Sequence, residues 1–147
     1  MASETEVTVA VSRYLVAMGF EIVSIALPGA GSGVVFHSED EDYPSIVPDI
    51  IARLPDHEFI VIESKPKYDN NDIFKLKSLI CGAYDKSIKT LLEVDKGRIR
   101  IAIAYPFSSS VVLKTSEADV DVIFTVDESQ MVRVSKDESK IFLDRSL

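Results

Sequence analysis

Apolar positions near the start of the chain repeat with the spacing of an α-helix. Five apolar or aromatic residues fall on one helical face: Val7, Val11, Tyr14, Leu15 and Met18. Ser3 followed three residues later by Glu6 is a capping-box sequence, and Gly19 is suited to end a helix. The pattern therefore predicts an amphipathic helix over residues 3–18.

The rest of the chain is divided into short apolar runs separated by turn residues. The predicted strands cover residues 21–27, two segments within 47–65, and residues 98–105 and 120–126, with a helix over 71–86. The segment from residue 131 is compatible with either a strand or a helix. This order predicts a mixed α/β fold, and a length of 147 residues predicts one domain over residues 1–147.

The two central predicted strands are separated by the turn-forming pair Pro55-Asp56. If the turn is centred on Asp56, Asp49 lies opposite Glu63, with Cβ atoms of such partners about 4.5–5.5 Å apart. A two-residue turn would move Asp49 to the other face of the sheet. The pairing of Asp49 with Glu63 therefore requires that the two strands be joined by an odd number of residues, or that a β-bulge restore the phase.

Two carboxylates at this separation repel each other unless a cation lies between them. Mg²⁺ binds carboxylate oxygens together with phosphate oxygens of a substrate. Lys65 lies two residues after Glu63, and side chains alternate along a strand, so both point to the same face. Asp49, Glu63 and Lys65 are therefore predicted catalytic residues for metal-dependent hydrolysis of a phosphodiester, with Asp49 and Glu63 as metal ligands.

Pro48-Asp49 and Glu63-Ser64-Lys65 resemble the motif of the PD-(D/E)XK nuclease superfamily, and the similarity in element order extends over about residues 3–105. The resemblance implies a restriction-endonuclease-like core of αβββαβ order, with a central mixed sheet flanked by helices. It also implies that the acids bind metal while Lys65 orients or deprotonates the attacking water. Residues 47–52 are similar to Holliday-junction resolvases, and residues 60–65 with 72–76 to type I restriction subunits, so the subfamily stays open.

The same resemblance implies a Mg²⁺-dependent deoxyribonuclease acting on DNA, with Mn²⁺ as a possible substitute. A homodimer is expected because closed two-fold pairing is the commonest oligomer, and it would let two sites cut both strands. The first helix supplies a further metal ligand in many members of that family. Glu4 continues the apolar face of this helix and is preferred to Glu6, which suits the capping role. The alternative is that both acids only favour the helix N-terminus through its dipole.

Three further residues are candidates for contact with nucleic acid. Lys75 and Lys77 on the second predicted helix are expected to attract phosphates, unless they are only the outer face of that helix. Ser32 lies in a glycine-rich loop where resolvases use a serine, and a hinge is the alternative. The site is followed by a group of lysines: Lys65, Lys67, Lys75, Lys77, Lys86 and Lys89.

The overall charge is unusual for a protein that binds DNA. The chain has 24 acidic and 16 basic residues and a formal net charge of −8, whereas gripping phosphates requires a basic face. We therefore expect weak intrinsic DNA affinity or a protein partner that supplies it. The competing hypothesis is a nuclease-fold protein with little or no cleavage activity, acting as a DNA-binding or assembly subunit.

Cysteine content and hydropathy indicate in which cellular compartment the protein is expected. The single cysteine, Cys81, is expected to pack as a small hydrophobic residue inside the second helix. One cysteine cannot form a disulfide framework, which favours a reducing, cytoplasmic setting. The chain has no charged-then-apolar leader and no apolar run near ~18 residues, so no membrane association is expected.

Overall fold

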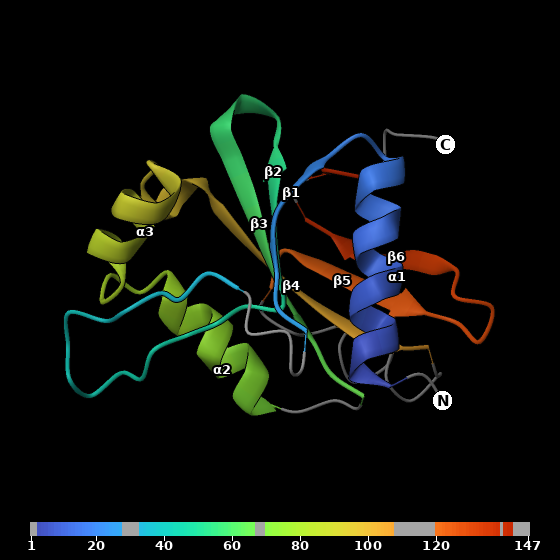
Figure 1. Cartoon of the computed structure of the whole chain (residues 1–147), viewed down its shortest axis with the longest axis horizontal. Coiled ribbons are helices and arrows are strands. Elements are labelled where there is room, and N and C mark those ends of the chain that lie inside the picture. The colour runs from blue at the N-terminus through green and yellow to red at the C-terminus, as the bar shows by residue number, and fades with distance from the viewer. Residues whose placement is uncertain (1–2, 28–32, 67–69, 108–119, 139, 143–147) are drawn as a thin grey trace.

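A computed structural model of the chain describes residues 3–27, 33–66, 70–107, 120–138 and 140–142. Six strands form one sheet in sequence order (Figure 1). They are β1 (Glu21–Ile25), β2 (Ile50–Leu54), β3 (Glu58–Ser64), β4 (Ile99–Pro106), β5 (Val122–Val126) and β6 (Val132–Asp137). The helices are α1 (Glu4–Ala17), α2 (Asn70–Leu79) and α3 (Asp85–Leu92).

The sheet is mixed, as predicted. Strands β1, β2 and β3 pair antiparallel, β3, β4 and β5 pair parallel, and β6 returns antiparallel along β5. The order α1–β1–β2–β3–α2–α3–β4 confirms the expected α/β core, with two helices where the αβββαβ succession has one. Short 3₁₀ segments at Pro55–His57 and Lys96–Arg98 complete the described elements.

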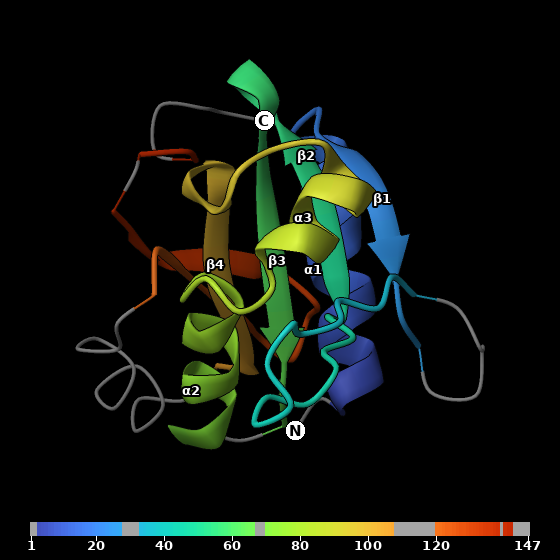
Figure 2. The same cartoon turned by 90° about the vertical axis from the view of Figure 1, so that its left-hand side faces the viewer.

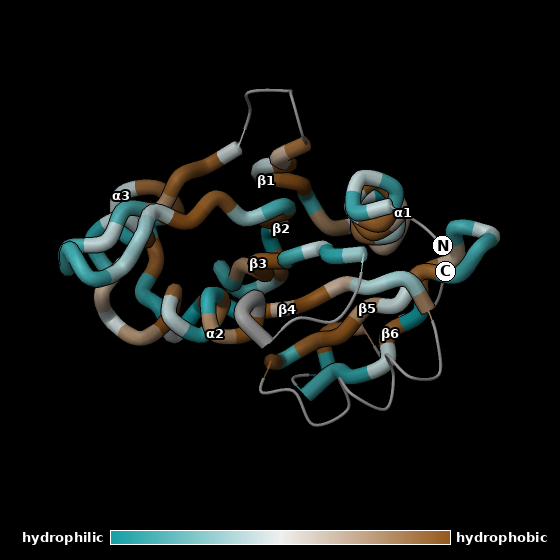
Figure 3. The backbone as a smooth tube through the Cα atoms, turned by 90° about the horizontal axis from the view of Figure 1, so that it is seen from below, coloured by the Kyte–Doolittle hydropathy of each residue, from teal (hydrophilic) through white to brown (hydrophobic). Residues whose placement is uncertain are grey.

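Each face of the sheet has its own apolar core. Helix α1 covers one face, where Val11 and Leu15 belong to the same buried cluster as Ile62. Helices α2 and α3 cover the other face, where Leu76 belongs to the same cluster as Val61 (Figures 2 and 3). Neighbouring residues of β3 alternate between the clusters, so this strand is apolar on both faces and buried. None of the described helices is long and apolar enough to cross a membrane.

Helix α1 begins as the sequence predicts. The Ser3 hydroxyl accepts a hydrogen bond from the Glu6 amide at 3.2 Å, and the Ser3 amide donates to the Glu6 carboxylate at 3.3 Å. These reciprocal bonds satisfy two amides that the first helical turn leaves without partners. The predicted capping box is confirmed.

The prediction of one helix over residues 71–86 is wrong. Helix α2 ends at Leu79 and α3 begins at Asp85, with Gly82 between them at a φ of +118°. Only glycine adopts this backbone conformation easily, and it is incompatible with a continuous helix. Cys81 lies in this break and is exposed, so its predicted burial is also wrong. The C-terminal segment, which the sequence left open, forms edge strand β6.

The connection between β2 and β3 has the predicted odd length. Pro55–His57 joins the two strands, and Asp56 at its centre has a φ of 62° and a ψ of 32°. Ile51 pairs with Val61 and Ile50 pairs with Ile62. Asp49 and Glu63 are the next residues in this register, so the predicted phase of the hairpin is confirmed.

Candidate metal centre

Asp49 and Glu63 meet at the end of the two central strands. Asp49 immediately precedes β2, and its Oδ2 atom accepts a hydrogen bond from the Ser64 amide at 2.8 Å. Glu63 is the penultimate residue of β3, and the Asp49 carboxylate lies close enough to its side chain to raise the pKa of Glu63. The hairpin therefore brings both predicted acids together on the face covered by α2.

The environment of Glu63 disfavours its charged form. The Glu63 side chain is only 3% exposed. Loss of water and the neighbouring Asp49 carboxylate raise the pKa of Glu63 to about 8, although the Lys75 ammonium acts in the opposite direction. The charged form of Glu63 is therefore disfavoured in the metal-free protein. A cation between the two carboxylates would offset both the burial of Glu63 and the repulsion from Asp49.

Lys75 also reaches this pair. Its Nζ atom lies 3.4 Å from Oε1 of Glu63, and its side chain is 37% exposed. The sequence predicted for Lys75 only phosphate attraction or a place on the outer face of the helix. In the structure the inner face includes Leu79, one turn after Lys75, so Lys75 points towards the strand end. The spacing of Lys75 and Leu79 is the sequence signal that would have revealed this contact.

Lys65 directly follows β3. Its amide donates to the Ala104 carbonyl at 3.0 Å, which continues the ladder with β4. Alternation along the strand places Lys65 on the same face as Glu63, and it is half-buried. Its location therefore agrees with the predicted Glu-x-Lys geometry, while its catalytic role stays a prediction.

The predicted third ligand, Glu4, does not join the pair. Glu4 begins α1, which packs on the opposite face of the sheet, although its N-terminus lies at the same end as the end of β3 (Figure 1). Among the described residues, no group of three or more His, Cys, Asp or Glu side chains could hold a metal. Because the sheet lies between α1 and the carboxylate pair, Glu4 is not grouped with Asp49 and Glu63. Glu6 serves as the capping residue of α1.

Of the other two predicted nucleic-acid contacts, the structure describes only Lys77. Lys77 is exposed and lines a hollow of about 130 Å³ together with Asp121 and Glu138. Residues two positions apart in an α-helix point in nearly opposite directions. Lys77 is therefore turned away from the carboxylate that Lys75 contacts. Ser32 lies outside the described residues.

No protein-family model matches the chain, and no curated protein sequence does. Among solved structures, the chain is similar to the EndoMS-dsDNA2 complex, with 12% sequence identity and a TM-score of 0.44. The alignment covers 86% of this chain and 47% of that chain, so the protein spans about half the length of this neighbour. A likeness at this level says nothing of individual site residues.

The donor atoms at the pair suit a hard divalent cation. Asp49 and Glu63 supply carboxylate oxygens, and the charge of each disfavours the charge of the other unless a cation is present. Mg²⁺ usually keeps several waters and takes only one or two protein carboxylates. The residues therefore fit Mg²⁺ or Mn²⁺, with Asp49 and Glu63 as ligands.

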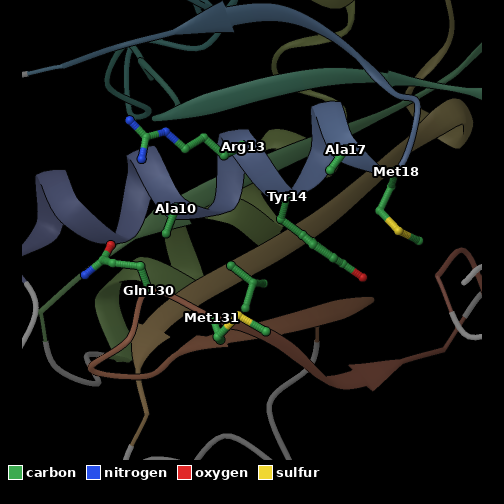
Figure 4. Close-up of a pocket in the computed structure, with 8 residues that line it drawn as sticks. Ala10, Arg13, Tyr14, Ala17, Met18, Gln130 and Met131 are labelled. Atoms are coloured by element: carbon green, nitrogen blue, oxygen red, sulfur yellow. The ribbon is translucent and has the colours of Figure 1, made fainter. Parts of the chain in front are cut away.

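A hollow of about 460 Å³ lies elsewhere, between α1 and the turn that joins β5 to β6 (Figure 4). Tyr14 and Met18 from the helix and Met131 from the turn contribute to its walls. It is on the α1 face of the sheet, and none of the predicted site residues lines it. The carboxylate pair is consequently distinct from this hollow.

The raised pKa of Glu63 predicts a pH-dependent stability of the metal-free protein. The Glu63 carboxyl keeps its proton to about pH 8 in the folded chain, against an ordinary pKa of 4.5. The stability that this proton contributes is fully present below about pH 4.5 and is lost as the pH rises to 8. We expect a loss on the order of a few kcal/mol over this range. Urea unfolding in EDTA at several pH values measures it.

The matching control is Glu63→Gln, which removes the titrating group and keeps the shape of the side chain. Its free energy of unfolding should depend less steeply on pH between 5 and 8 than that of the wild type, in about the range where Glu63 titrates. Parallel curves for the two proteins would show that Glu63 does not titrate with a raised pKa.

Proposed function

We propose that this chain is a metal-dependent endonuclease that hydrolyses phosphodiester bonds of DNA. The observation that carries the proposal is the contact between the Asp49 and Glu63 side chains at the end of β2 and β3, with Lys75 Nζ 3.4 Å from Glu63. A buried carboxylate beside a second, half-buried one destabilises a fold unless the pair holds a proton or a cation. Retaining such a pair beside lysines is understandable when it binds a metal.

The residues have distinct roles in this reaction. Asp49, oriented by the Ser64 amide, and Glu63 would hold Mg²⁺ or Mn²⁺. When bound, the cation lowers the pKa of water and neutralises charge that develops on the phosphate. Lys65, on the same face, orients the attacking water or stabilises the charge of the transition state. Lys75 keeps Glu63 neutralised until the cation arrives and then adds positive charge near the phosphate.

The role of Lys75 leads to a prediction about metal affinity. Lys75→Gln should bind Mn²⁺ more tightly than the wild type, by roughly tenfold, because an ammonium at 3.4 Å competes with the metal for Glu63. Calorimetric titration at several pH values separates this effect from competition by the proton, because removing Lys75 also removes a charge that lowers the pKa of Glu63. Lys89→Gln on the exposed side of α3 is the matched control and should change nothing. Equal or weaker metal binding by Lys75→Gln would contradict the competition.

A supercoiled plasmid tests the proposed activity. We expect conversion to nicked and then linear DNA with Mg²⁺ or Mn²⁺, and none with EDTA. A homodimer, which is part of the proposal, would cut both strands and favour the linear product. Preference for a four-way junction would indicate a resolvase, and defined fragments would indicate a restriction enzyme. A plasmid that stays supercoiled under all of these conditions would refute the proposed nuclease activity.

One alternative function is favoured by specific observations. The Lys75 ammonium beside Glu63 offers this buried acid a positive partner without a metal, and the net charge of −8 disfavours tight binding to DNA. Both features suit a nuclease-fold subunit that binds DNA or assembles with a partner protein without cutting. Binding of labelled duplex with no cleavage in either metal would identify this role.

A further inference from the structure

A solvent-exposed aromatic ring lies beyond the carboxylate pair on the neighbouring strand. Phe107 directly follows β4 and is 47% exposed, although its amide is fixed to the Val126 carbonyl at 2.8 Å. Tyr105 belongs to the core under α2 and α3. Alternation therefore places Phe107 on this face too, which is the face of Glu63. An exposed phenylalanine on a rigid strand end presents a flat apolar surface at a defined position.

Arg133 holds this ring from the other side of β5. Its guanidinium carbon lies 5.7 Å from the Phe107 ring centroid, within the range of a cation–π contact. Arg133 pairs with Thr125 of β5, so its side chain crosses that strand to reach Phe107. Arg133 is exposed, and within the described part of the chain it forms no ion pair.

The register places this pair at a useful distance from the metal centre. Glu63 pairs with Ile103, and Phe107 is four residues further along β4 in the direction in which both parallel strands end. At about 3.3 Å per residue, Phe107 is roughly 13 Å beyond Glu63 along the strand direction. A short segment of a nucleic-acid strand can therefore contact both positions.

We infer that Phe107 and Arg133 form a binding site for an unpaired nucleotide of the substrate strand. The base stacks on the Phe107 ring, and Arg133 attracts the adjacent phosphate. Stacking requires a base whose face is uncovered, which a base inside an intact duplex does not offer. Every base has such a face, so the site selects unpaired structure without selecting sequence. The inference rests on the proposed function, and it names single-stranded or locally unpaired DNA as the preferred ligand.

Binding of labelled oligothymidine and of a matched duplex tests the inference without any cleavage. Measurements by fluorescence anisotropy in EDTA should show that Phe107→Ala weakens binding of the single strand about tenfold, the scale of one lost stack. Phe107→Tyr should retain wild-type affinity to within about twofold, because it keeps the ring. Duplex affinity should change less than single-strand affinity in Phe107→Ala.

The contribution of the Arg133 charge is tested by making the same substitution at two arginines. Arg133→Gln should weaken binding of the single strand and lower the slope of log K against log salt by about 0.7. Arg13→Gln, an exposed arginine of α1 on the other face of the sheet, is the matched control and should have a smaller effect on both quantities. If the two variants have equal effects, Arg133 contributes only non-specific electrostatic attraction, and the proposed site is wrong.

The outcomes separate this inference from the proposed function. If the wild type does not bind the single strand, or if Phe107→Ala binds it as well as the wild type, the inference is wrong even when the plasmid is cut. An equal loss for single strand and duplex would also overturn it. Weaker single-strand binding by Phe107→Ala without metal-dependent cleavage would support the site and refute the nuclease.

Discussion

Asp49→Asn should abolish metal-dependent cleavage and leave the fold intact. The substitution removes one of the two charges that hold the metal, while an amide oxygen can still accept the hydrogen bond from the Ser64 amide. Without metal, the variant should be as stable as the wild type or slightly more stable, because the repulsion between Asp49 and Glu63 is removed. Cleavage of supercoiled plasmid and thermal melts with and without Mn²⁺ measure both effects.

The melts provide a test that does not depend on activity. A metal at about one hundred times its Kd stabilises the wild type by roughly 2.7 kcal/mol, and the variant should gain almost none of this. Asp56→Asn is a matched control, because it makes the same chemical change in the turn of the same hairpin, away from the pair. It should keep both cleavage and stabilisation by metal. If the wild type gains no stability from Mn²⁺ or Mg²⁺, the proposed metal centre is wrong.

Lys65→Ala should slow cleavage by a factor of at least about one hundred, with DNA affinity nearly unchanged. A positioned group that assists proton transfer or stabilises developing charge typically contributes this much or more. Lys65 follows Glu63 on the same face, so its ammonium acts on the reacting groups and only slightly on general attraction of the strand. Single-turnover cleavage at saturating protein, together with titration of labelled duplex at several salt concentrations, separates rate from binding.

Lys89→Ala on α3 controls for the loss of one positive charge. This exposed residue should leave the single-turnover rate unchanged, and any effect should be confined to binding at low salt. If Lys65→Ala cleaves at the wild-type rate, Lys65 is not part of the mechanism. Lys75, whose ammonium contacts Glu63, would then be the lysine that acts at the pair.

Local patterns predicted those features that depend on neighbouring residues. The alternation of β2 and β3 and the three-residue connection around Asp56 determine which residues of the hairpin face each other, so the meeting of Asp49 and Glu63 could be predicted from the sequence. The start of α1 was predictable for the same reason, since the Ser3 and Glu6 bonds span one helical turn. Neither feature requires knowledge of the rest of the fold.

Contacts between distant elements were decided by the tertiary structure. Packing of Leu76 and Leu79 on the sheet set the rotation of α2 and brought Lys75 to Glu63, whereas the apolar pattern alone allowed another rotation. The placement of α1 on the opposite face separated Glu4 from the acids. Phe107 and Arg133 meet only because β4, β5 and β6 are adjacent. Spacing along the chain determines the direction of a side chain within its own element, but its partners depend on how whole elements pack to bury their apolar faces.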